Sequence, residues 1–222
     1  MRLALTLFFF CSGLFASDIW LKGSGSEFQL STAGSPTQAV WVYVSESTDT
    51  KVGVEMYFSM PSLLGGENVE LWLQSHFGRK EPPILEASYL MTSAMNSPEK
   101  VDLLAVRRSQ GLGMGDFLFL DEKKLASLKV GEETVETPAG KVRATHYRST
   151  SSEQTLDYWI SEQAKPIGLV KLESRGTQVF SMSLKRLVRN VASKISPAAA
   201  GPASPDTIQL LNLSGGSLPL VP

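Results

Sequence analysis

Apolar and polar side chains alternate in several segments of the chain. Two neighbouring segments show this most clearly, separated by a polar stretch over 45–50, and their alternating apolar residues are Val40, Val42, Val44, Val52, Val54, Met56 and Phe58. A strand points successive side chains to opposite faces, so a period of two predicts a half-buried antiparallel pair. The same alternation returns over 69–74 and, after a turn at 78–83, over 84–91.

The segment 137–174 predicts three further strands joined by two turns. Pro138-Ala139-Gly140 marks the first turn and Lys165-Pro166-Ile167-Gly168 marks the last. Strands are also predicted near 27–30, 134–136 and 178–187. About nine or ten strands at this spacing favour a sheet that curls or closes to protect its edges. We therefore predict a mainly β fold, a curved antiparallel sheet or incomplete β-barrel with a few short helices.

Three segments are less clear. Ser97-Pro98-Glu99 could begin a helix, because Pro suits the first turn and Glu suits the positive helix end, although 101–103 also fits a strand. Residues 116–120 are short and apolar, which fits a strand or a buried turn. Residues 121–128 form the best helical candidate, of about two turns.

The first sixteen residues have the pattern of a secretory signal peptide. Arg2 precedes an apolar run from Leu3 to Phe10, and Ala16 stands at a plausible cleavage point before Ser17. The run is too short to span about 30 Å of hydrocarbon comfortably, which disfavours an uncleaved anchor. Lipidation of Cys11 is disfavoured by the bulky phenylalanines before it. We expect an exported, periplasmic or envelope-associated protein with no transmembrane span in the mature chain.

The C-terminal stretch has a different composition. From Ser193 to Pro222 the chain is rich in Pro, Ala, Ser and Gly, which cannot bury enough apolar surface to offset ordering entropy. We predict a signal peptide over 1–16, one β-rich domain over 17–192 and a disordered tail over 193–222. Removal of that tail is expected to leave ligand binding intact.

The charge balance excludes some partners. The chain has 21 Lys and Arg against 22 Asp and Glu, a formal net charge of −1. Without a basic excess, we expect no nucleic-acid partner. The chain has a single cysteine, which lies in the predicted signal, so the mature protein would have no thiolate.

The sequence offers no convincing catalytic or metal-binding set. Its two histidines, His76 and His146, are far apart, and each is more simply a cross-strand structural residue than a ligand. Gly111-Leu-Gly-Met-Gly115 has the wrong spacing for a dinucleotide loop. Glu132-Glu133 lies in a predicted turn, where both carboxylates would face solvent. We therefore expect no enzyme, no cofactor and no metal site.

One predicted strand face could bind an apolar ligand. Methionine and aromatic side chains adapt to irregular apolar molecules such as acyl chains. If the three strands share one face, that face carries Met56, Phe58, Leu71, Leu73, Tyr89 and Met91. An ordinary closed core is the alternative explanation of the same pattern.

The segment 137–174 also resembles a group of uncharacterised bacterial periplasmic proteins. The matching elements are the Thr137-Pro-Ala-Gly140 turn, Thr145-His146-Tyr147, Asp157-Tyr-Trp-Ile-Ser161 and Pro166-Ile-Gly-Leu-Val-Lys171. That group is similar to the outer-membrane lipoprotein-sorting carriers, in which an incomplete barrel plugged by short helices holds acyl chains. The resemblance covers about forty residues well and implies a fold rather than an activity.

Two functions remain open at this stage. The first is a periplasmic, non-catalytic carrier that holds lipid or a lipidated partner in an apolar groove. The second is a structural or protein-interaction module of the cell envelope, with a filled core and a binding surface outside it. An exposed aromatic patch around Trp41, Trp72 or Trp159 would favour the second.

Overall fold

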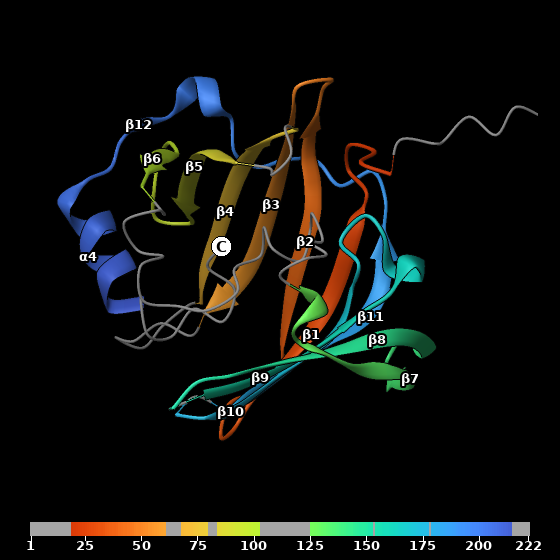
Figure 1. The fold of residues 1–222 in the computed structure, drawn as a ribbon. Helices are drawn as coiled ribbons and strands as arrows, with labels where there is room; N and C mark the ends of the chain where they lie inside the picture. The colour runs from red at the N-terminus through yellow and green to blue at the C-terminus, as the bar shows by residue number, and fades with distance from the viewer. Residues whose placement is uncertain are drawn as a thin grey trace, which may run out of the picture.

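The described strands of this chain form one twelve-stranded sheet. The computed structural model describes residues 19–60, 68–79, 84–102, 125–152, 154–177 and 179–214. Within these residues the strand order is β12-β6-β5-β4-β3-β2-β1-β11-β10-β9-β8-β7 (Figure 1). The strands are β1 (Gly25–Thr32), β2 (Gln38–Ser47), β3 (Lys51–Met60), β4 (Val69–Gly78), β5 (Leu85–Thr92), β6 (Glu99–Val101), β7 (Lys129–Thr137), β8 (Gly140–Thr150), β9 (Gln154–Ile160), β10 (Leu169–Gly176), β11 (Phe180–Val188) and β12 (Gly201–Pro202).

Two runs of consecutive antiparallel strands are joined through the first strand. β1 pairs with β2 on one side and with β11 on the other. Gly25 permits the β1–β2 approach, because a Cβ at that position would lie 2.2 Å from the Val42 carbonyl oxygen. The short β12 runs parallel to β6. The join between β1 and β11 connects residues far apart in sequence, which local patterns do not predict.

Among the described strands, the sheet is curved and does not close. Its order ends at β12 on one side and at β7 on the other. Bulges interrupt several pairings, including β1–β11 between Glu27 and Phe28 and β2–β3 between Val44 and Glu46. Such bulges bend the strands and increase their twist. In Figure 1, β8–β10 run across the direction of β2–β4. The predicted mainly β, curved sheet is therefore confirmed.

Helices are few and short in the described part of the chain. They are η2 (Glu162–Ala164), η3 (Pro197–Ala199) and α4 (Pro205–Ser214). The possible helix beginning at Ser97 is wrong for residues 99–101, which form β6. Of the predicted helix over 121–128, only 125–128 is described, as a short helical turn leading into β7. The predictions for 111–115 and 116–120 lie outside the described residues.

The predicted disordered tail is wrong for residues 193–214. The side chain of Ile195 is buried, Gly201 pairs with Glu99, and α4 follows. Ser204 caps this helix, because its hydroxyl accepts from the Thr207 amide at 3.3 Å. Composition suggested disorder, but the segment gains order by binding to distant strands. Residues 215–222 lie outside the described part.

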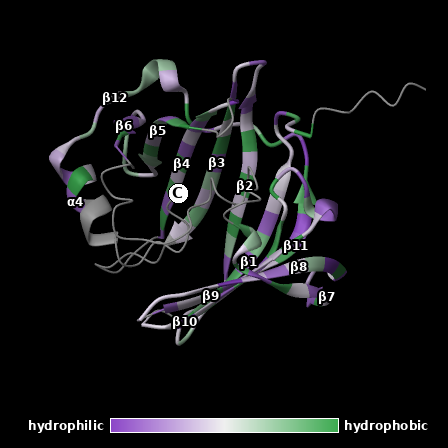
Figure 2. Ribbon diagram, in the orientation of Figure 1, coloured by the Kyte–Doolittle hydropathy of each residue, from purple (hydrophilic) through white to green (hydrophobic). Residues whose placement is uncertain are grey.

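Apolar residues follow the strand alternation. Figure 2 shows hydrophobic and hydrophilic positions alternating along β2 and β4. The side of the sheet that carries Phe28, Val42 and Leu73 is called the inner face here, and the opposite side is called the outer face. These three side chains are at most 3 % exposed. Burial of one whole face explains why the alternation is clear in the sequence.

Candidate functional site

The centre of the predicted ligand-binding face lies on the inner face of the sheet. In the β3–β4 pairing, Met56 lies directly opposite Leu73, and Phe58 lies directly opposite Leu71. All four side chains are buried, with exposed fractions between 1 and 7 %. Directly opposed residues share one face, so these four form a continuous apolar surface.

Tyr89 and Met91 do not belong to that surface, and their assignment to it was wrong. Tyr89 lies opposite Gln74, and Met91 lies opposite Trp72, so both point to the outer face. Leu90 lies opposite Leu73 instead and is 1 % exposed. In β5, aromatic and sulfur-containing residues alternate with small or apolar ones, so both faces look apolar in the sequence. Only the pairing register determines which set faces inward.

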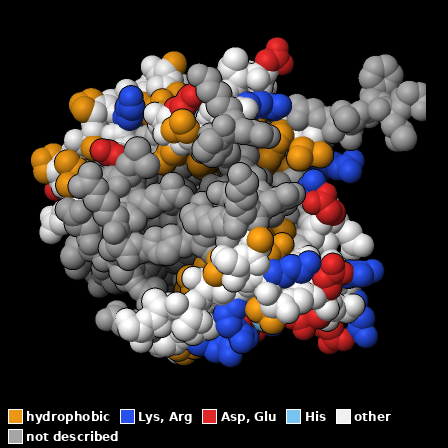
Figure 3. All heavy atoms as spheres, in the orientation of Figure 1, with side chains coloured by type: hydrophobic (Ala, Val, Ile, Leu, Met, Phe, Trp, Pro, Cys, Tyr) orange, Lys and Arg blue, Asp and Glu red, His pale blue; other side chains and the backbone are white. Residues whose placement is uncertain are grey.

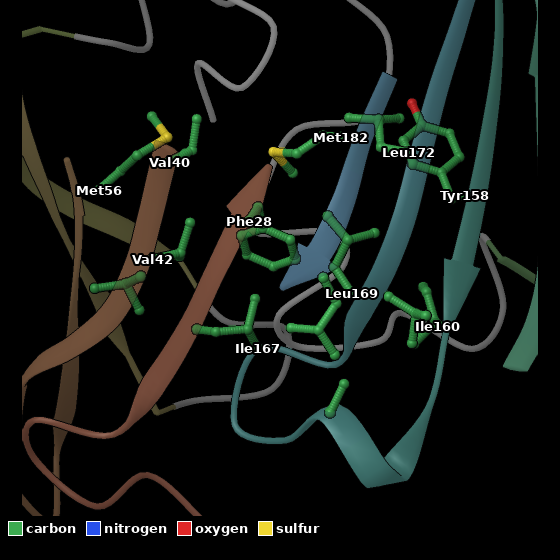
Figure 4. Close-up of a cluster of buried hydrophobic side chains, with 14 of the residues drawn as sticks. Phe28, Val40, Val42, Met56, Tyr158, Ile160, Ile167, Leu169, Leu172 and Met182 are labelled. Carbon is green, nitrogen blue, oxygen red and sulfur yellow. The ribbon is translucent and has the colours of Figure 1, made fainter. Parts of the chain in front are cut away.

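The apolar inner face continues across β1 and into the second half of the sheet. Phe28 lies opposite both Val40 and Leu184, and Leu172 lies opposite both Met182 and Tyr158. Figure 4 shows Phe28, Met56, Met182 and Tyr158 around one common apolar cluster. The inner face is therefore mainly apolar from β9 to β5, and the buried serines Ser26, Ser75, Ser88 and Ser174 also lie on it.

The connection between β9 and β10 adds to this cluster. Ala164, Ile167 and Leu169 are buried there, and Figure 4 places Ile167 and Leu169 beside Phe28. Gly168 has a φ of +78°, which favours glycine, and its amide donates to the Ala164 carbonyl at 2.9 Å. The Lys-Pro-Ile-Gly turn noted in the sequence thus places apolar side chains against the inner face.

The outer face carries a buried carboxylate that the sequence analysis missed. Glu55 is completely buried. Its Oε1 accepts from the Tyr43 hydroxyl at 2.6 Å and from the Lys194 amide at 2.9 Å. Its Oε2 accepts from Gln74 Nε2 at 2.9 Å and from the Ser193 hydroxyl at 2.5 Å. Four donors thus satisfy the carboxylate, two from strands β2 and β4 and two from the segment 189–196, which we name the crossing segment.

This polar network extends along the outer face. Gln74 Oε1 lies 3.0 Å from His76 Nε2, and the His76 ring contacts Tyr89 edge-on at 5.4 Å. Burial, followed by the charge of Lys51, lowers the pKa of His76, which favours a neutral ring. Burial and the Glu55 carboxylate raise the pKa of Tyr43, which keeps its hydroxyl protonated as a donor. The sequence pattern did not predict this network, because a Glu that alternates with buried residues on a strand usually faces solvent.

Next to this network, a row of three aromatic residues and one methionine, all half-buried, crosses the outer face. Trp41 lies opposite Tyr57, Tyr57 lies opposite Trp72, and Trp72 lies opposite Met91. The Tyr57 and Trp72 ring centroids are 5.3 Å apart. All four side chains are partly exposed. We name these four residues the aromatic row.

Cations lie over two rings of the aromatic row. The Arg186 guanidinium lies 5.6 Å from the centre of the Trp41 ring, and Lys194 Nζ lies 5.3 Å from the centre of the Trp72 ring. Such cation–π contacts stabilise the ring position. Glu27, beside Trp41, accepts from Lys185 at 2.7 Å and from Arg186 at 2.5 Å.

His146 lies in a second polar cluster, on β8 and β9. Its Nε2 is 2.6 Å from Asp157 Oδ1, its Nδ1 is 3.2 Å from Glu133 Oε1, and its ring stacks on Trp159 at 4.5 Å. Asp157 also binds Arg148 Nε at 2.7 Å and Arg175. The ring of Trp159 is buried in this cluster, while neighbouring Tyr158 faces the inner side.

Paired charges explain the electrostatics of this cluster. Burial alone would raise the pKa of Asp157, but hydrogen bonds from Arg148 and His146, with the charges of Arg148 and Arg175, hold it below its usual value. Every group in the cluster therefore has a partner that stabilises its position. In the described ranges, no group of three or more His, Cys, Asp or Glu residues could hold a metal ion.

Comparison with known proteins identifies no family for this chain. No family model matches the chain, and a search of curated proteins returned no match. Within the described residues, no helix is both long and apolar enough to cross a bilayer. One solved structure, a "putative lipoprotein" from Parabacteroides distasonis ATCC 8503, is similar at 10 % identity, a TM-score of 0.34, and coverage of 76 % of this chain and 96 % of that chain. A likeness this distant supports no argument, so the resemblance to lipoprotein-sorting carriers stays an expectation from the sequence.

Proposed function

We propose that this chain is an exported, non-catalytic binding protein that holds an apolar chain, of a lipid or of a lipidated protein, against the inner face of its sheet. The supporting observation is the mainly apolar inner face from β9 to β5, on a sheet that is open within the described residues. A curved sheet of this size can surround a small ligand, as barrels of about eight strands do.

The composition of that face supports an apolar rather than a polar ligand. Met56 and Met182 supply flexible, polarisable side chains that adapt to irregular apolar shapes. Phe28, Phe58 and Tyr158 supply large rigid surfaces beside them. An acyl chain could pack among such side chains without leaving a polar group unpaired.

Titration with a fluorescent fatty acid tests this proposal. Wild-type protein should show saturable binding at micromolar concentrations. Met56→Gln places an amide on the inner face at nearly constant volume and should weaken binding about tenfold, because an unpaired buried amide costs about 1–3 kcal/mol. Native mass spectrometry of protein purified from its host, followed by lipid extraction, should identify the ligand.

Met91→Gln is the matched control. The substitution has the same chemistry, but Met91 lies on the outer face. It should leave fatty-acid affinity unchanged, and near-UV circular dichroism should show that both variants are folded. Absence of saturable binding by the wild type, or equal weakening by both substitutions, would contradict the proposal.

A second candidate function is an envelope interaction module with a filled core. The partly exposed aromatic row on the outer face favours it. The same titration separates the two functions, because a filled core would leave no saturable site for the fatty acid.

A further inference from the structure

The aromatic row is a second surface that ligand binding on the inner face does not use. Its members come from four adjacent strands, β2 to β5, and lie on the face opposite Met56 and Leu73. Neighbouring strands are about 4.8 Å apart, so the row is roughly 15 Å long and one residue wide.

Two Trp and one Tyr with cations beside them have a distinct chemistry. Rings with one apolar body and one polar atom suit the boundary between water and hydrocarbon, and Lys and Arg side chains suit the headgroup layer next to it. Lys194 and Arg186 lie over Trp72 and Trp41, so one cation accompanies each Trp of the row.

The exposed charges beside the row are mostly positive. Glu27 binds Lys185 and Arg186, which hold its pKa below the usual value although burial opposes this. Glu70 accepts a hydrogen bond from the Tyr57 hydroxyl at 3.1 Å. Glu27 and Glu55 are buried, so the exposed charges described beside the row are the cations Lys185, Arg186 and Lys194 and the Glu70 carboxylate. This arrangement favours an anionic over a cationic partner.

The size of the row favours a membrane over a protein partner. A stable protein interface buries about 800 Å² on each side, which a single row of four side chains does not supply. Peripheral attachment to a bilayer needs only a few interfacial aromatic side chains and neighbouring basic residues. We propose that the aromatic row docks this protein on the surface of a membrane that contains anionic lipid.

Flotation with lipid vesicles tests the proposal. The probes are vesicles of phosphatidylcholine alone and vesicles of phosphatidylcholine mixed with phosphatidylglycerol. Wild-type protein should float with the mixed vesicles and bind the neutral ones more weakly. Trp72→Gln should lower the partition coefficient about tenfold, because it removes the largest apolar surface of the row.

Lys194→Gln should lower that coefficient about fivefold, the effect of one basic residue at an anionic surface. This change keeps the backbone amide that donates to Glu55. Its matched control is Lys141→Gln at the β7–β8 end, where Figure 3 shows charges of both signs mixed together. The control for Trp72→Gln is Val130→Gln on β7, whose side chain is 55 % exposed. Both controls should bind as the wild type does.

Three results would overturn the proposal. In the first, the wild-type protein floats with neither kind of vesicle. In the second, Lys194→Gln and Lys141→Gln lower the partition coefficient equally. In the third, Trp72→Gln protein floats as well as the wild type. Concentration-dependent self-association abolished by Trp72→Gln, without vesicle binding, would instead assign the row to contacts between copies. Met56→Gln should not affect flotation, and Trp72→Gln should not affect fatty-acid affinity, so this proposal and the proposed function fail separately.

Discussion

At the scale of single residues, buried polar groups are part of the folded structure beside the apolar core. Glu55 and Asp157 are both fully buried, and each is held by several donors from different strands. Burying a carboxylate is costly unless hydrogen bonds replace its water. Each of these residues therefore stabilises the folded state only as long as its partners stay in place.

Replacing Glu55 should destabilise the fold strongly. Glu55→Ala leaves the Tyr43 hydroxyl, the Gln74 amide and the Lys194 amide without their acceptor, and we expect a loss of about 3–5 kcal/mol in the free energy of unfolding. Urea denaturation measures the loss. The control is Glu70→Ala, which removes an exposed acceptor of Tyr57 and should cost less than about 1 kcal/mol. Equal midpoints for the two variants would contradict the importance of the buried network.

The Asp157 carboxylate should make the free energy of unfolding depend on pH in the acid range. Its folded pKa lies below the usual 3.8, so it contributes stability that is present above pH 3.8 and is lost as the pH falls through the folded pKa. Asp157→Asn should be less stable than the wild type at neutral pH, and the difference should shrink below about pH 4. Urea melts over a pH series test this. A constant difference at all pH values would rule out the charge as its cause.

At the scale of elements, the crossing segment connects the middle of the sheet to one of its edges. The segment leaves β11 in the middle of the sheet, passes Glu55 and Gln74 on the outer face, and reaches β6 at the edge. β12 then pairs with β6, which covers that edge strand. The residues expected to form a free tail therefore act as part of the domain.

Two truncated chains test how much the crossing segment contributes to the stability of the fold. A chain ending at Ala192 lacks the Ser193 and Lys194 donors to Glu55, whereas a chain ending at Ser196 retains both. We expect the shorter chain to be less stable than the longer one by about 2–4 kcal/mol, because two hydrogen bonds to a buried charge are lost. Thermal unfolding of both chains provides the measurement. Identical midpoints would restore the original view of a dispensable tail.

At the scale of the whole molecule, the two faces of the sheet have separate roles in our proposals. The inner face is mainly apolar from β9 to β5, while the outer face combines buried polar networks with the aromatic row. A protein organised in this way could hold an apolar ligand on one side and contact a membrane with the other. Both roles are compatible with the export that the N-terminal pattern predicts.

Export predicts a definite mature N-terminus. The apolar run ends at Ala16, so the mature chain should begin near Ser17. N-terminal sequencing of protein from its native host would test this directly. An intact Met1 would show an uncleaved chain, and a lipid-modified Cys11 would show lipoprotein processing; either would contradict the prediction.

Local sequence patterns determined the strands. In a half-buried sheet apolar and polar side chains alternate along each strand, and this alternation can be read without knowing which strands pair. Most predicted strands, and the turns at 138–140 and 165–168, therefore lie where the sequence placed them. Long-range contacts were decided only by the tertiary structure. A bulge and the pairing register turned Leu90 inward and Tyr89 and Met91 outward. The order of the crossing segment depends on Glu55, more than a hundred residues earlier in the chain, and no local composition carries that information.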